Sequence, residues 1–320
     1  MRTVLHIGPH KTGTTSFQHR LHANRDGLAK AGILYPVSGS FIFGQHRLPF
    51  ALLDRTDPHR GDVPDLSAEA AALKDEIERT KPDLLILSSE EFSVLRSDHI
   101  ARLAETLDLE TPEIVAVVRH PVELLFSAYI HRIIKPDSTF KQNVETFAAN
   151  ALSRVAGLDM DRWLAAWATR FGDSSVKLVP YRKGNIVADI VAEIGIDPGL
   201  LREDPAPLAN AALDPRAVEL VRLARLAGYS QEDCERAQNL AAGWFTDRAA
   251  LPAITVETLR HLLETLCPLY DPVFEKYLGQ ANPFGIGNFE DLAARLSPGL
   301  NRKDLVSFLV ETTRPLSSKK

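Results

Sequence analysis

Residues 3–16 read TVLHIGPHKTGTTS, and this stretch decides the fold. The run Thr3–Ile7 is rich in residues that favour a short strand. The two glycines that follow it, five positions apart, predict a loop whose backbone N–H groups curl around a phosphate-like anion at the start of a helix. The familiar ATP and GTP loop places its lysine directly after the second glycine. Here Thr14 follows Gly13, and the lysine is Lys11.

Strand patterns alternate with helix patterns over the first 184 residues. Continuous apolar runs such as IVAVV are typical of strands that are buried in a parallel sheet. We expect strands at 3–7, within 84–92, at 114–119 and at 175–181, and helices from residue 14 to Gly32, from Ser67, near 98–108 and from Pro121. Residues 36–66 read as a long loop. The alternation predicts an α/β fold, with a P-loop-type parallel sheet flanked by helices.

The composition is that of an ordinary globular protein. The chain has 320 residues, 45% of them hydrophobic and 25% charged, and a net charge of −5, so nothing in it favours a nucleic-acid partner. Two cysteines make no disulfide framework. We expect a cytoplasmic protein without a signal peptide or an integral membrane segment, and no cluster of Cys and His suggests a metal site. The oligomeric state cannot be read from the sequence.

The pattern Lys11-Thr12-Gly13-Thr14-Thr15 after a strand resembles the 5′-phosphosulfate loop of sulfotransferases that use 3′-phosphoadenosine 5′-phosphosulfate (PAPS). A second motif of that family, R-x-P followed by a serine, matches Arg119, Pro121 and Ser127 directly after the strand IVAVV. Two motifs in the family's order, about a hundred residues apart, reinforce each other. The chain looks most similar to the bacterial, carbohydrate-type members.

The resemblance implies where the donor PAPS would bind. The residues expected around its 5′ end are His10, Lys11, Thr12, Gly13, Thr14, Thr15 and Ser16. Arg119 and Ser127 would hold the 3′-phosphate, and Tyr181, at the end of a strand, would lie near the adenine. Cytosolic small-molecule sulfotransferases usually carry a tryptophan where this chain has Ser16, so adenine stacking must come from elsewhere.

The sequence also predicts two regions with different roles along the chain. Residues 1–200 would form the PAPS-binding core. The patterns after about residue 184 are helical throughout, so we expect residues 201–320 to form a helical region that packs on the core or covers the acceptor site. Arg182-Lys183-Gly184 is similar to a motif near the family's C-terminus, but it comes too early in this chain for that role to be carried over.

Sulfuryl transfer explains an early lysine. The sulfuryl group carries about one negative charge less than a phosphoryl group, so a lysine and backbone N–H groups can neutralise it without the Mg²⁺ that kinases require. We therefore expect Lys11 at the bridging oxygen between phosphate and sulfate, and no required metal.

A hydroxyl acceptor needs a general base. Glu90 follows the strand LLILSS, where the family's carbohydrate enzymes often place a glutamate, and His46 lies in the long loop. Both are candidates, against the plainer readings of a glutamate that caps a turn and a solvated histidine. For Glu91 the capping role is favoured.

The acceptor itself stays open. The family favours a saccharide or glycolipid over a small phenol or a peptide. Two other functions remain: a P-loop kinase with an atypical lysine that uses ATP and Mg²⁺, and a non-catalytic nucleotide-binding or scaffold protein on this fold.

Overall fold

A computed structural model describes residues 1–135, 138–202 and 213–313. The chain divides into two compact units, and each is assembled from separate stretches of sequence. The first unit comprises Met1–His120, Asp159–Leu208 and Leu269–Asn282; the second comprises Pro121–Leu158, Ala209–Pro268 and Pro283–Lys320. The boundary near residue 200, which was expected from the extent of the family resemblance, stays a prediction.

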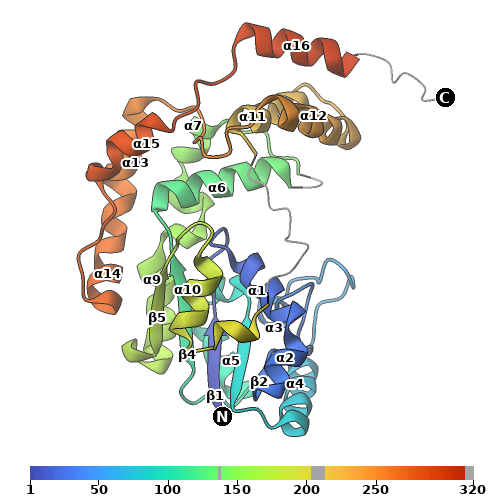
Figure 1. Ribbon diagram of the computed structural model, residues 1–320, viewed down its shortest axis with the longest axis vertical. Helices are drawn as coiled ribbons and strands as arrows, with labels where there is room; N and C mark the ends of the chain where they lie inside the picture. The colour runs from blue at the N-terminus through green and yellow to red at the C-terminus, as the bar shows by residue number, and fades with distance from the viewer. Residues whose placement is uncertain (136–137, 203–212, 314–320) are drawn as a thin grey trace, which may run out of the picture. The chain divides into compact units, whose positions relative to one another are not determined.

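The first unit is built around a five-stranded sheet with the strand order β2-β3-β1-β4-β5, in which every pair of neighbours is parallel (Figure 1). The strands are β1 (Arg2–His6), β2 (Ile33–Leu34), β3 (Leu84–Ser88), β4 (Glu113–Val118) and β5 (Val176–Pro180). The α/β fold expected from the sequence is therefore present. The two-residue β2 was not foreseen, because its apolar run is too short to stand out from a helix end.

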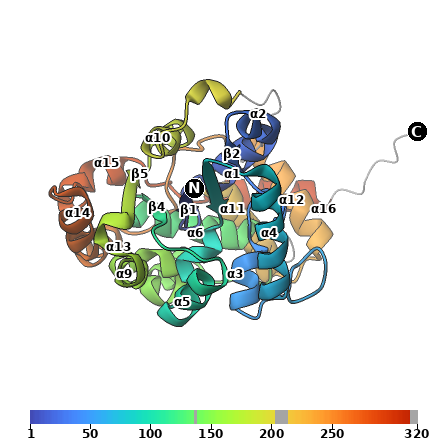
Figure 2. The ribbon, with the colours of Figure 1, turned by 90° about the horizontal axis from the view of Figure 1, so that it is seen from below.

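Helices cover both faces of this sheet, which is why its strands read as continuous apolar runs. The strands β1, β3 and β4 alternate their side chains between two buried faces, and all five residues of β3 are buried. One face packs on α1 (Thr14–Ala23), α2 (Arg25–Lys30) and α10 (Ile186–Glu193) through Phe17, Leu21, Leu28 and Ile190. Figure 2 shows α5 (Ser97–Thr106) and α9 (Met160–Phe171) on the side opposite α10.

Further helices of the first unit flank this core. They are α3 (Arg47–Leu52), α4 (Leu66–Thr80) and α14 (Asp271–Leu278), with the short 3₁₀ turns η1 (Glu90–Val94), η3 (Asp173–Ser175) and η4 (Pro198–Leu200). Trp163 and Trp167 of α9 are buried, and Trp167 meets Phe92 edge to face at 6.2 Å. Both tryptophans are therefore core residues.

Three details differ from the sequence expectations. The helix expected up to Gly32 breaks at Asn24 into α1 and α2. Helix α4 begins at Leu66 and not at Ser67, and its cap is Asp65, whose carboxylate accepts the N–H of Ala68 at 2.8 Å. Residues 36–66 are not a continuous loop, because α3 forms within them and is held by tertiary contacts of its buried side chains.

Because all neighbouring strands are parallel, their carboxyl ends meet at one edge of the sheet. Ligands of open α/β sheets bind outside this edge. Four segments follow the strands at this carboxyl edge of the sheet: the loop 7–13 after β1, η1 after β3, Arg119 after β4 and Tyr181 after β5. The register sets His6 beside Ser88, so the first two segments begin side by side.

Helices alone form the regular structure of the second unit within its described residues. They are α6 (Pro121–Ile134), α7 (Val144–Ala148), α8 (Ala151–Arg154), α11 (Pro215–Leu226), α12 (Gln231–Trp244), α13 (Val256–Leu266), α15 (Phe289–Ala294) and α16 (Arg302–Thr313), with the 3₁₀ turns η2 (Ala156–Leu158) and η6 (Ile286–Asn288), while η5 (Cys267–Tyr270) spans a unit boundary. Small residues such as Ala217, Ala237 and Ala241 let α11 and α12 pack closely. No helix among the described residues is long and apolar enough to cross a membrane.

Candidate functional site

The loop between β1 and α1 is curled by three residues in the left-handed region. Gly8 has φ 88°, Lys11 has φ 68° and Gly13 has φ 84°. A Cβ on Gly13 would lie 2.7 Å from a methyl group of Ile186, so neither the backbone conformation nor the space allows a side chain there. Thr12 is fully buried and its hydroxyl donates to the carbonyl of Pro9 at 2.5 Å, which fixes the loop from within.

Helix α1 starts directly after this loop, at Thr14. Its first turn holds no acidic residue, and no side chain caps it through a hydrogen bond. The positive end of the helix therefore stays available to an anion. Thr14 is buried, Thr15 is half-buried and Ser16 is exposed.

Arg119 connects the first loop to the end of β4. Its guanidinium donates to the carbonyl of Lys11 at 2.6 Å and lies 4.6 Å from the centre of the Tyr181 ring. The backbone N–H of Tyr181 in turn donates to Val118 at 2.8 Å. The structure thus brings Lys11, Arg119 and Tyr181 together, although they are separated by more than 60 residues along the chain at each step.

Lys11 carries a destabilised charge. Burial lowers the pKa of its ammonium, the nearby Arg119 guanidinium lowers it further, and the Glu90 carboxylate partly compensates. A partly desolvated cation of this kind interacts strongly with an anion that enters its site.

Glu90 begins η1 at the end of β3 and lies against the phosphate-type loop. A Cβ on Gly8 would come within 2.9 Å of the Cα of Glu90, so a glycine is needed for the two segments to approach. Ser89 caps η1 by accepting the N–H of Glu91 at 3.2 Å. The cap therefore comes from Ser89, and the Glu90 side chain points elsewhere.

Three side chains surround the Glu90 carboxylate. Gln18 of α1 donates to Oε2 at 3.0 Å, the Nε2 of His46 lies 3.8 Å from the same oxygen, and the Nδ1 of His10 lies 3.7 Å from Oε1. The Nδ1 of His46 is hydrogen-bonded to the Ser89 hydroxyl at 2.7 Å, which fixes its ring. The carboxylate is 16% exposed, so it is sheltered but reachable from solvent.

The electrostatic balance keeps Glu90 ionised. Burial alone would raise the pKa of its carboxyl group, but the fields of His46 and His10 and the hydrogen bond from Gln18 outweigh burial and lower it. Burial lowers the pKa of His46, against the field of Glu90. For His10, whose side chain is half-exposed, partial desolvation disfavours the charge, yet the hydrogen bond to Glu91 and the fields of both glutamates raise its pKa.

Glu91 has different partners. One oxygen lies 3.2 Å from the Nε2 of His10, and the other is paired with the guanidinium of Arg55. Burial would raise the pKa of Glu91, but the hydrogen bond and field of His10 and the field of Arg55 lower it. Glu91 is therefore held in an ion pair, whereas Glu90 faces two imidazoles.

Residues 36–46 fold over the end of β3. Gln45 exchanges hydrogen bonds with Ser88: its N–H donates to the Ser88 carbonyl at 2.9 Å, and its side-chain oxygen accepts the Ser88 N–H at 2.9 Å. A Cβ on Gly44 would lie 2.7 Å from the Ser88 carbonyl and 2.8 Å from Nε2 of His46. This close packing holds the His46 ring beside the Glu90 carboxylate.

The predicted site residues fall into two groups. Lys11, Arg119, Tyr181, Glu90, His46 and His10, with the loop residues Thr12, Gly13, Thr14, Thr15 and Ser16, all belong to the first unit at the carboxyl edge of the sheet. Ser127 is half-buried on α6 in the second unit. His6 is fully buried and hydrogen-bonded to Ser88 at 2.8 Å, and burial lowers its pKa to about 4, so it is a neutral core residue.

Sequence reasoning missed three neighbours of the glutamates: Gln18, Ser89 and Arg55. Gln18 follows Thr14 by four positions on one helix face, so its proximity to the loop could have been foreseen. Arg55 meets Glu91 only through the tertiary fold, and no local pattern indicates it.

No protein-family model matches the chain, and no curated protein matches it. Among solved structures, it is similar to a sulfotransferase from Alicyclobacillus acidocaldarius, with 16% sequence identity, a TM-score of 0.37, and coverage of 74% of this chain and 99% of the other. What the site can do follows from its own residues.

Proposed function

We propose that this chain is a PAPS-dependent sulfotransferase that acts on a hydroxyl or amine acceptor by direct in-line transfer. The observation that carries the proposal is the hydrogen bond from Arg119 to the Lys11 carbonyl, which joins the early-lysine loop to the Arg-x-Pro segment. A donor with phosphate groups at two ends of one adenosine needs two such anion-binding segments close together.

The residues present fit such a donor. The curled loop, the uncapped start of α1 and the Lys11 ammonium form a cationic cradle for the 5′-phosphosulfate. Arg119 would take the 3′-phosphate, and Tyr181 would neighbour the adenine; a role for Ser127 at that phosphate stays a prediction from the sequence motif. PAPS, when bound, supplies the sulfuryl group, and the product nucleotide would be 3′-phosphoadenosine 5′-phosphate (PAP).

Lys11 would stabilise the charge that develops on the leaving oxygen. Its desolvation supports this role, because a cation already stripped of water needs no reorganisation when negative charge appears. The chemistry requires no metal on this account.

Glu90 would accept the proton of the acceptor. It is ionised at neutral pH, shielded from bulk water and held by Gln18, so its carboxylate is ready to receive a hydrogen bond from a hydroxyl group. The lowered pKa makes it a weaker base, and His46 at 3.8 Å offers a second site for the proton. We therefore assign Glu90 as the base, with His46 supporting it.

The acceptor that we propose is a saccharide or a glycolipid. The half-exposed His10 and the loop 36–46 border the same carboxylate, so the acceptor would approach past polar side chains as well as the aromatic rings of Phe41 and Phe50 around His46.

The deciding experiment compares the affinities of the full chain for PAP and for ADP, each with and without Mg²⁺, by isothermal titration calorimetry. We expect PAP to bind more tightly than ADP, and without metal. Transfer of labelled sulfate from PAPS to a cell extract and to a panel of saccharides then identifies the acceptor.

Each other outcome supports a different function. Equal affinity for both nucleotides, or binding only with Mg²⁺, would favour a kinase with an atypical lysine. PAP binding with no sulfate transfer to any acceptor, and a biological role retained by Lys11→Ala, would favour a non-catalytic nucleotide-binding protein.

A further inference from the structure

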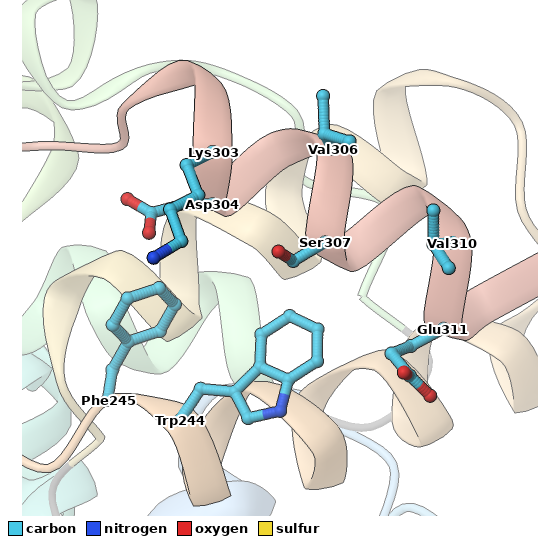
Figure 3. A pocket seen from close by; sticks show the side chains of 8 residues that line it. All are labelled: Trp244, Phe245, Lys303, Asp304, Val306, Ser307, Val310 and Glu311. Carbon is cyan, nitrogen blue, oxygen red and sulfur yellow. The ribbon is translucent and has the colours of Figure 1, made fainter.

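Two hollows in the second unit are not used by the proposed function. One, of about 500 Å³, lies between the end of α12 and α16, where Lys303, Ser307 and Glu311 extend toward Trp244 and Phe245 (Figure 3). Its lining mixes charged and apolar groups without a consistent chemistry. The other has a volume of about 420 Å³, within the range of small-molecule sites.

The walls of this second hollow, which we call the α11 pocket, are mainly aliphatic. They come from four separate stretches of the second unit, in and around α6–α7, α11, residues 252–253 and residues 297–305. The aliphatic side chains include Ile130, Val144, Val218, Leu223, Leu300 and Leu305. Among the described residues that line it, Tyr129 alone carries an aromatic ring. Such walls suit a flexible hydrocarbon better than a flat ring system.

The arginines that border the α11 pocket are already neutralised. Arg222 donates to both oxygens of Glu219, at 2.8 and 2.6 Å, and to the carbonyl of Lys141 at 2.9 Å. Arg216 donates to both oxygens of Asp214, at 3.1 and 2.8 Å. A ligand anion would have to break one of these bidentate pairs, so neither arginine is available to bind an anionic ligand.

Glu145, the other acidic residue of the lining, also has hydrogen-bond donors for both of its carboxylate oxygens. Glu145 accepts the N–H of Thr255 at 2.8 Å and the hydroxyl of Thr258 at 2.7 Å. The charged side chains of the lining are therefore all paired without a ligand. What the pocket offers to an incoming molecule is its apolar surface.

From this combination we propose that the α11 pocket binds a neutral aliphatic chain, as found in an alkyl glycoside or a lipid. The pocket is a binding site distinct in chemistry from the anion-binding loop of the first unit, and it does not depend on the sulfotransferase proposal. Apolar burial drives the binding, and the head group contributes little.

A chain-length series tests this directly. The full chain is titrated calorimetrically with hexyl, octyl and decyl glucoside as monomers, with glucose as the head-group control. Each added methylene should strengthen binding about fourfold until the pocket is full, after which the affinity stops rising. Glucose should not bind at the concentrations used.

Blocking the pocket provides the matched control. Ala253 lines the pocket and is exposed, so Ala253→Trp should plug it and reduce octyl glucoside affinity at least tenfold. Ala249, equally exposed and four residues earlier outside the lining, gives the control Ala249→Trp, which should bind normally. If Ala253→Trp misfolds, Leu305→Trp, at a lining position that is 37% exposed, blocks the pocket instead. Its control is Leu226→Trp, at an exposed position outside the lining.

Three results would overturn the proposal. An affinity that keeps rising with chain length without a plateau would indicate nonspecific adsorption. Equal loss in the plug and control variants would place binding elsewhere. Octanoate binding ten times more tightly than octanol would show an anion site, since a neutral-chain site should not distinguish them in that direction.

Discussion

Two polar clusters of the first unit begin at neighbouring residues and behave differently. Arg47 is 5% exposed and is paired with three carboxylates, Asp57 at 2.6 Å, Glu69 at 2.7 Å and Asp62 at 3.0 Å. His46, one residue earlier, approaches Glu90 at 3.8 Å and leaves that carboxylate partly reachable. We call them the Arg47 cluster and the Glu90 cluster.

The contrast separates a structural cluster from a chemical one. In the Arg47 cluster the hydrogen bonds to Asp62, Asp57 and Glu69 raise the pKa of the guanidinium despite burial, so its charge is fixed at every relevant pH. In the Glu90 cluster the contacts are longer, and His10 and His46 have pKa values shifted in opposite directions. Titratable groups that are not held in short ion pairs and that a ligand can reach can exchange protons with that ligand.

The largest effect is expected from Glu90→Gln. The amide can still accept a hydrogen bond from Gln18 but cannot take a proton, so the rate of sulfuryl transfer should fall by about 10²- to 10⁴-fold. Steady-state kinetics measures the rate, and thermal denaturation checks that the fold is kept. The control is Glu91→Gln, which loses its pairing with Arg55 and should change the rate far less; equal loss in both would remove the distinction between the two glutamates.

Arg47→Met tests the other cluster. Removing the cation leaves three carboxylates facing one another around a nearly buried position, so unfolding should become easier by about 3–5 kcal/mol. Urea denaturation measures this. The matched variant Arg96→Met, at a side chain 71% exposed and paired with Asp98 at 3.3 Å, should change stability by about 0–1 kcal/mol. Similar losses in the two variants would show that the Arg47 cluster is not structural.

Lys11→Ala tests the anion-binding loop that borders the Glu90 cluster. Loss of the ammonium should lower transfer by about 10²- to 10³-fold, since one preorganised group that stabilises developing charge contributes on this scale. The exposed Lys183→Ala is the control and should keep its rate. A Lys11→Ala enzyme with unchanged kcat would rule out the leaving-group role.

The smallest effect concerns pH. The Glu90 carboxylate is the basic form above its lowered pKa, and the cationic His10 helps to lower it. In His10→Gln this help disappears and the pKa of Glu90 rises, so the acidic limb of kcat/KM against pH should move to higher pH, while His46 and Gln18 still contribute their part of the lowering. The exposed His261→Gln in the second unit should leave the profile unchanged. A downward shift in His10→Gln would contradict the assigned sign.

Much of the fold could be predicted from local sequence. The parallel sheet follows from apolar runs such as IVAVV, and the loop after β1 follows from its glycines. Helix α3 could not be predicted, because its side chains are buried by tertiary contacts and Arg47 is held by acidic partners outside the helix. The break at Asn24 was missed for a related reason: the apolar positions at 17, 21 and 28 continue through it.

The candidate site divides in the same way. Lys11 and Arg119 were recognised because each follows a strand in a short motif, and the sequence offered Glu90 and His46 as rival bases. The structure joins them: His46 faces Glu90 while bonded to Ser89. The two residues that the sequence offered as alternative bases therefore lie beside each other in the structure.

By itself, the sequence determined the strand, the curled loop and the early lysine, because each depends on residues within about ten positions of one another. Only the tertiary structure decided which side chains surround Glu90. The pairing of β1 with β3 sets His6 beside Ser88, and this register brings the loop at Gly8 against Glu90. Gln18 then reaches the carboxylate from α1, and Gln45 fastens the segment that carries His46. These contacts join residues 43 to 82 positions apart, so the pairing of the strands and the packing around it fix them, and local preference does not.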